Sequence, residues 1–156
     1  MRPKLIENLM SNGIMKYKKE NNKVLVVLEK GDEIFESIYK VIEVFKINFG
    51  WINGIGAAEK IILGAYPSKL KKYVKKNFSG EYEIASMMGN ITSKENESFV
   101  HLHAVISDEE CNAFAGHLFT ATISVTCEMI INIVDTKIIR NECKDIGLFL
   151  WNFNNG

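Results

Sequence analysis

The histidines of this 156-residue chain lie close together in the sequence and are candidate metal ligands. His101, His103 and His117 are its only three histidines. Neutral imidazole is the commonest metal-binding side chain in proteins. Three imidazoles around an ion with an open fourth position form the ligand set of a well-known class of catalytic zinc site. These residues therefore predict a site for a divalent metal ion, with zinc as the expected ion.

The spacing of the histidines indicates how they would meet. His101 and His103 lie in the apolar run FVHLHAVI (99–106), which predicts a strand. Side chains two positions apart on a strand share a face, with Cα atoms about 7 Å apart. His117 falls in the next predicted strand, after the polar loop 108–112, so an antiparallel hairpin would bring it beside the pair. From spacing alone, an equally good interpretation is that these histidines are hydrogen-bonded or exposed and bind nothing.

Three further residues could support a site at the histidines: Gly116, Glu128 and Glu83. Gly116 directly precedes His117 and permits a close approach of the backbone to a neighbour or to the metal. Glu128 lies in the apolar run ISVTCEMIINIV, where a buried carboxylate is costly unless paired. Glu128 is therefore a candidate catalytic acid or base, a partner of a histidine, or a member of an ion pair between subunits. The alternative is a solvent-facing position on an amphipathic strand; Glu83 is a weaker candidate of the same kind.

The charge balance disfavours direct recognition of DNA. The chain has 19 basic and 19 acidic residues, and Arg2 and Arg140 are its only arginines. Base and phosphate recognition favours the rigid fork of arginine over lysine. The lysine-rich stretch 69–76 is open to two interpretations: it contacts phosphates, or its lysines protect an edge strand from aggregation.

The cysteines and the hydropathy pattern predict a cytoplasmic protein. Cys111, Cys127 and Cys143 are odd in number and form no CxxC motif, which is typical of reduced thiols. No stretch approaches the roughly 20 apolar residues of a membrane span. The first residues contain too short an apolar run for a signal peptide. We therefore expect a soluble protein without a membrane partner.

The first half of the chain predicts a short arm, two strands and a helix. Residues 1–12 form a helical or loose arm before a single domain at 13–156. Residues 14–17 and 24–28 are rich in aliphatic side chains and predict strands, the second (VLVVL) buried on both faces. Asp32 is the expected N-cap of a helix whose apolar residues recur at helical spacing from Ile34 to Phe45.

The second half predicts a series of strands. We expect them at 51–58, 59–66, 70–78, 82–91, 99–106, 113–119 and 123–134, with hairpin loops at 92–98 and 108–112. The pattern favours one α+β domain with a large, mainly antiparallel sheet.

Several segments, in this order, resemble the plants-and-prokaryotes conserved (PPC) domain family. They are LEKGDEIFESI (28–38), GWINGIGAAEKIILGAY (50–66), YEIASMMGNI (82–91), FVHLHAVISDEE (99–110), AGHL (115–118) and TATISVTCEMII (120–131). The last three are the most specific, and the three histidines are the motif itself. Ala115 stands where the family usually has the first glycine of GGH.

The resemblance implies a strongly bent antiparallel sheet packed by a helix, assembly as a homotrimer, and His101, His103 and His117 as metal ligands. The fold is also similar to that of acetolactate decarboxylases, whose zinc is held by three histidines. In plants the domain follows AT-hook motifs that bind DNA, and stand-alone prokaryotic members are commonly labelled candidate DNA-binding proteins. This chain has no Arg-Gly-Arg-Pro core, so direct DNA binding is not expected.

The resulting hypothesis is a stand-alone metal-binding protein that binds a small molecule or catalyses a metal-assisted reaction. The alternatives are a DNA-binding or regulatory protein acting through the trimer, and a trimeric structural module in which the histidines only stabilise assembly.

Overall fold

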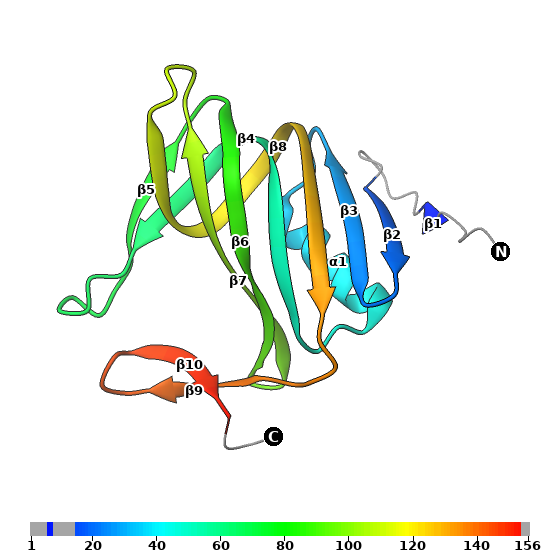
Figure 1. Ribbon diagram of the computed structural model, residues 1–156. Helices are drawn as coiled ribbons and strands as arrows, with labels where there is room; N and C mark the ends of the chain where they lie inside the picture. Colours follow the sequence, from blue (N-terminus) through cyan, green and yellow to red (C-terminus); the bar gives the residue numbers. More distant parts are fainter. Residues whose placement is uncertain (1–5, 8–14, 154–156) are drawn as a thin grey trace.

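The computed structural model describes residues 6–7 and 15–153 and shows a strongly bent β-sheet with one helix packed on one face (Figure 1). Within these residues the sheet has ten strands. Along the chain the elements are β1 (Ile6–Glu7), β2 (Lys16–Glu20), β3 (Lys23–Glu29), α1 (Ile34–Phe45), β4 (Gly50–Ala65), β5 (Val74–Phe78), β6 (Tyr82–Lys94), β7 (Glu97–Ser107), β8 (Ala113–Ile133), β9 (Ile139–Cys143) and β10 (Leu148–Asn152). The predicted α+β class with a mainly antiparallel sheet is confirmed.

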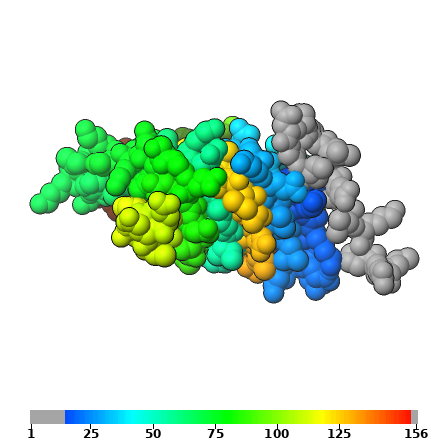
Figure 2. All heavy atoms as spheres, turned by 90° about the horizontal axis from the view of Figure 1, so that it is seen from above, coloured from blue at the N-terminus to red at the C-terminus, as the bar shows by residue number. Residues whose placement is uncertain are grey.

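The strand order places segments that are distant in sequence side by side. The order is β1-β2-β3-β8-β4-β6-β9-β10, with β5 added to β4. Seen from above, the later part of β8 (orange) lies between β3 (blue) and β4 (Figure 2). All pairings are antiparallel except the short contact between β6 and β9. Because β7 pairs with both β6 and β8, the strands β4, β6, β7 and β8 close into a ring, and this closure requires the bend.

Two pairs of predicted strands are in fact single long strands. The expected strands 51–58 and 59–66 form the continuous β4, and 113–119 and 123–134 form β8. The division into short strands is therefore wrong. Shifts of register between β4 and β8 let both strands bend without ending, which a linear pattern does not reveal.

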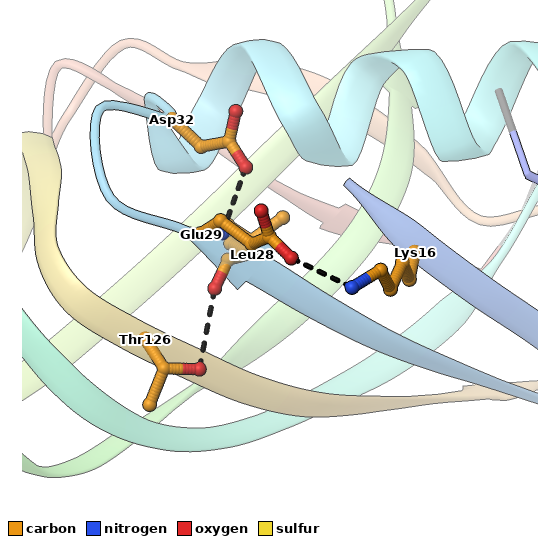
Figure 3. A network of polar contacts seen from close by, with 5 residues as sticks. All are labelled: Lys16, Leu28, Glu29, Asp32 and Thr126. Carbon is orange, nitrogen blue, oxygen red and sulfur yellow. Dashed lines mark hydrogen bonds and ion pairs between the residues drawn. The ribbon is translucent and has the colours of Figure 1, made fainter. Parts of the chain in front are cut away.

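The helix begins one residue later than predicted. The N-cap is Glu33, whose carboxylate accepts a hydrogen bond from the backbone N–H of Glu36, so the prediction of Asp32 is wrong. Asp32 instead accepts from the backbone N–H of Glu29 at 2.9 Å and closes the turn after β3 (Figure 3). The other carboxylate oxygen of Glu33 accepts from the Thr120 hydroxyl at 3.0 Å, which ties the start of α1 to β8.

Only one face of the sheet is covered by α1. The helix buries Ile34, Ile38 and Val41, and each such side chain stabilises the fold by about 1.5–3 kcal/mol. The prediction that 24–28 is buried on both faces is wrong, because β3 alternates between buried and exposed positions. On the opposite face several large apolar side chains are more than a third exposed. We call them the open apolar face: Leu25, Val27, Ile55, Met88 and Ile130.

The two ends of the chain depart from the predicted pattern more than the loops do. Of the predicted arm 1–12 only Ile6–Glu7 is described, as a short strand paired with β2; the rest lies outside the described residues. The loop 108–112 is found as predicted, whereas the turn between β6 and β7 is tighter than expected. The C-terminal hairpin of β9 and β10 was not predicted. No helix among the described residues is long and apolar enough to cross a membrane.

Candidate metal centre

The register of β7 and β8 brings the three histidines together. His103 and His117 are direct partners across this antiparallel pair, and His101 lies two residues before His103. Direct partners, and residues two apart, share a face of the sheet, so the three imidazoles point to the same side. One nitrogen from each ring lies within 4.8 Å of the others. The ring centroids are 5.0–5.5 Å apart.

Two glycines allow the backbone to place the histidines this closely. A Cβ atom on Gly116 would lie 2.8 Å from the carbonyl oxygen of Gly64, so this glycine allows β8 and β4 to approach beside His117. A Cβ atom on Gly89 would lie 1.8 Å from the carbonyl oxygen of His101. Both contacts are to backbone atoms, which cannot rotate away as a side chain can.

The environment keeps two of the rings neutral at pH 7. Burial, followed by the nearby charges of His117, Arg140 and His103, lowers the pKa of His101 to about 4. Burial, followed by His103, Lys75 and Arg140, lowers the pKa of His117 to about 4. A histidine must be deprotonated to bind a metal ion, so both rings offer a lone pair at neutral pH.

His117 also has a buried nitrogen without a partner. Its Nδ1 atom is inaccessible to solvent and makes no hydrogen bond to any described residue. The ring packs against Tyr73 and Phe119, with centroid separations of 4.9 and 4.6 Å. An unpaired buried polar atom costs about 1–3 kcal/mol, and a metal ion bound at Nδ1 itself would offset this cost.

The donor set fits a divalent ion such as zinc. Nitrogen ligands bind zinc at about 2.0–2.1 Å, so two ligands of a tetrahedral ion lie about 3.4 Å apart. The three ring nitrogens lie within 4.8 Å of one another, so one ion could be shared by all three rings. Among the described residues, this is the one group of three or more histidine, cysteine or acidic side chains with such an arrangement.

Arg140 is a residue of the site that the sequence analysis missed. It comes from β9, and its side chain is buried beside His101, with 3.3 Å between Nη2 and the Nδ1 atom of that ring. Because a guanidinium only donates, the contact makes this ring nitrogen an acceptor and fixes the orientation of the imidazole. The one available signal was its type, an arginine in a chain whose other cations are nearly all lysines. Its link to His101 depends on the C-terminal hairpin.

The predicted carboxylates lie elsewhere in the single chain. Glu128 is exposed on the sheet face opposite α1, where its register partners are Val27 and Ile55. It lines a hollow of about 320 Å³ together with Glu83. Neither residue lines the pocket beside the histidines. The structure therefore does not bring Glu128 to the metal centre within one chain, and its catalytic role stays a prediction.

The three cysteines are free thiols, as the sequence indicated. Cys127 is buried, and burial together with the charge of Glu128 raises the pKa of its thiol to about 12. A thiol with so high a pKa is a poor metal ligand at neutral pH.

Comparison with known proteins identifies the family. Residues 15–135 match the model of the Plants and Prokaryotes Conserved (PCC) domain, the family also abbreviated PPC. The chain belongs to this family. A search of the curated proteins finds no match to the chain.

Solved structures show the same fold. A candidate DNA-binding protein from Bacteroides thetaiotaomicron is 32% identical, with a TM-score of 0.86 over 89% of this chain and 97% of its own. A metal-containing protein from Archaeoglobus fulgidus is 27% identical, with a TM-score of 0.78 over 92% of this chain and 99% of its own. An acetolactate decarboxylase from Bacillus subtilis is 19% identical, with a TM-score of 0.53 over 78% of this chain and 57% of its own. This last likeness is one of fold alone, and it confirms the expected similarity of fold.

Proposed function

We propose that His101, His103 and His117 hold a divalent metal ion, zinc in the first instance, and that this centre binds a small molecule or catalyses a metal-assisted reaction on it. The observation that carries the proposal is the convergence of three ring nitrogens, one from each histidine, from two paired strands. The metal-containing relative from Archaeoglobus fulgidus supports it. When bound, such an ion polarises an oxygen of a ligand or lowers the pKa of a bound water.

The surrounding residues have defined roles in this proposal. Arg140 orients the ring of His101 through Nδ1. Tyr73 and Phe119 pack on the ring of His117 and exclude water from that side. A pocket of about 370 Å³ adjoins His101 and His117, within the size range of small-molecule sites. A ligand in this pocket would contact both the ion and the aromatic side chains.

The experiment is a measurement of metal content on purified protein. We expect one zinc ion per chain, lost in His101→Ala and in His117→Ala. The matched control is Cys111→Ala, which removes an exposed thiol away from the histidines and keeps the metal. A folded wild-type protein that takes up no zinc, cobalt or manganese from the buffer would overturn the proposal.

We also propose that the chain assembles as a homotrimer through the open apolar face. Exposed apolar patches of this kind mark interaction surfaces. By register, His103 pairs with Met88, Met88 with Asn53, and Asn53 with Ile130, so the metal centre and the open apolar face lie on the same side of the sheet. A neighbouring copy on this face would lie close to the centre, and we propose that its Glu128 reaches the centre in this assembly. Sedimentation of Ile55→Glu should show a smaller species than the wild type; an unchanged trimer, or a monomeric wild type, contradicts the assembly.

A second candidate function is DNA binding. It is supported by the exposed lysines of the β5 region and by the description of the Bacteroides relative. Its test is a salt-dependent mobility shift of duplex DNA that weakens when Lys71, Lys72, Lys75 and Lys76 are replaced by glutamine. No shift at low salt removes direct DNA binding.

A further inference from the structure

Arg140 carries a buried positive charge that no carboxylate in the described part of the chain compensates. Its side chain is almost fully buried, with a residue exposure of 7%. Three of its hydrogen bonds go to neutral oxygens: from Nε to the Thr92 hydroxyl at 2.9 Å, from Nη2 to the Asn90 side chain at 3.0 Å, and from Nη1 to the Phe149 carbonyl at 2.9 Å. The fourth contact is to His101. No ion pair with an acidic group is found for it among the described residues.

A buried charge without a counter-ion is costly, so it indicates that a partner is missing from the single chain. The hydrogen bonds position the guanidinium, but they do not neutralise it. A guanidinium has five N–H groups, and four are engaged if His101 is counted. At least one N–H of Nη1 is left for a ligand.

The guanidinium lines the pocket that adjoins the histidines, and this pocket is cationic. Among its lining residues the charged ones are Arg140 and Lys94, and none is acidic. Lys94 pairs at 3.7 Å with Glu95, a surface residue, and its ammonium lies 3.9 Å from the centre of the Phe149 ring. The field inside the pocket therefore favours an anion even before a metal ion adds two positive charges.

The remainder of the pocket is aromatic and aliphatic. Five rings line it together with leucine and valine side chains: Phe35, Tyr73, Phe99, Phe119 and Phe149. The ring of Phe99 lies 5.0 Å from the guanidinium carbon of Arg140, so an apolar surface begins directly beside the charge. Such a surface accepts a hydrocarbon body and disfavours a fully hydrated inorganic ion.

We propose that this pocket binds a small organic carboxylate, with Arg140 as the group that recognises the carboxylate and the aromatic rings as the contact for its hydrocarbon part. The inference rests on the proposed small-molecule site, because it names the ligand class of the same pocket. A monocarboxylate matches one guanidinium charge and its small number of free N–H groups better than a phosphate dianion, which needs more donors.

A simpler explanation is that Arg140 only fastens the C-terminal hairpin to β6 through Asn90 and Thr92. A fastening role requires no selectivity for anions. The two explanations therefore differ in whether the protein distinguishes an acid from its neutral amide of the same shape.

The test is a calorimetric titration of 3-phenylpropionate and 3-phenylpropionamide into zinc-loaded and chelator-treated wild-type protein. We expect the acid to bind at least about tenfold more tightly than the amide in both forms, with zinc adding to the preference. Equal binding of acid and amide, or no binding of the acid, overturns the proposal without any variant. Tighter binding of phenyl phosphate than of 3-phenylpropionate overturns the choice of a carboxylate.

Variants then assign the selectivity to Arg140. Arg140→Gln should lower the affinity for the acid to about the affinity for the amide. Arg140→Lys, which keeps the charge, should retain a preference for the acid. Lys137→Gln, which removes an exposed charge of the same region, is the control and should bind as the wild type does. If Arg140→Gln does not fold, Arg140→Lys and the wild-type comparison decide. A folded Arg140→Gln with wild-type selectivity overturns the role of Arg140.

Chelator-treated wild-type protein separates this proposal from the metal centre. Loss of zinc with a persisting preference for the acid supports the carboxylate site. If the wild-type protein never binds zinc but still prefers the acid, the metal centre alone is refuted. If the wild-type protein binds zinc but has the same affinity for the acid and the amide, the carboxylate site alone is refuted.

Discussion

Replacing Gly89 with alanine is expected to destroy the metal centre through the backbone. Gly89 lies on β6 opposite Leu102, which separates two of the histidines on β7. A Cβ atom at this position would lie 1.8 Å from the carbonyl oxygen of His101 and 2.9 Å from the Cα atom of Leu102. Since such contacts are not tolerated below about 3.0 Å, the two strands must separate locally by about 1.2 Å.

The expected consequence is loss of metal together with a moderate loss of stability. Metal–ligand distances tolerate deviations of only about 0.2 Å, so a displacement several times larger at His101 removes the ligand from the ion. Forcing extra atoms into a packed region costs about 1–3 kcal/mol. For a chain of 156 residues, 1 kcal/mol corresponds to about 3 °C in Tm, so the variant should melt roughly 3–9 °C below the wild type.

The assay combines thermal unfolding in the presence of a chelator with zinc content after dialysis. The chelator removes the contribution of the metal from Tm, so that the cost of packing is measured alone. Glu97→Ala, at an exposed position of β7, is the control and should behave as the wild type in both measurements. A Gly89→Ala variant with wild-type Tm and a full complement of zinc would show that the strands are not held as closely as described.

Three further predictions concern pH, metal and Glu128. The pKa values of His101 and His117 are lowered from 6.5 to about 4, so the unfolded chain binds more protons than the folded chain between these pH values. The free energy of unfolding of the metal-free protein should therefore fall as the pH decreases from 6.5 to 4. Urea titrations that show no decrease, or the same decrease in His117→Ala, contradict this prediction. Free zinc at about 1,000 times its Kd should stabilise the protein by about 4 kcal/mol, or roughly 12 °C in Tm, as measured by calorimetry with and without chelator; an unchanged Tm contradicts a site that binds the folded state. If Glu128 acts only from a neighbouring copy, Glu128→Gln should leave the zinc content unchanged and lower any activity. The loss of activity caused by Glu128→Gln should disappear when Ile55→Glu dissociates the assembly. Loss of zinc in Glu128→Gln would instead place Glu128 in the ligand set.

Much of the architecture follows from local pattern. The helix at 34–45 was predicted because its apolar residues recur at helical spacing, and the alternating and apolar runs predicted the mainly antiparallel sheet. Local pattern was weaker at boundaries. The capping residue is Glu33 rather than Asp32, and β4 and β8 continue through the boundary 58/59 and through residues 120–122, where shorter strands were predicted to end. A strand can continue through a shift in register, because its partners on the neighbouring strands hold it, and these partners are invisible in a linear sequence.

The sequence by itself determined the identity of the three candidate ligands. Their rarity, the HxH spacing and a third histidine beyond a polar loop were enough to predict that they share one side of a hairpin, and β7 and β8 pair in the register that puts His103 opposite His117. That outcome needed only the two-residue repeat of a strand and a short loop, both of which are local properties.

Only the tertiary structure decided what surrounds these histidines. Arg140 reaches His101 because the C-terminal hairpin folds back beside β6. Glu128 stays away from the histidines because its part of β8 pairs with β3 and β4, whereas the part that carries His117 pairs with β7. Both results depend on the closure of β4, β6, β7 and β8, which is set by pairings between residues far apart in the chain. The sequence therefore identified the residues that offer lone pairs, while long-range packing determined which charge, rings and pocket they face.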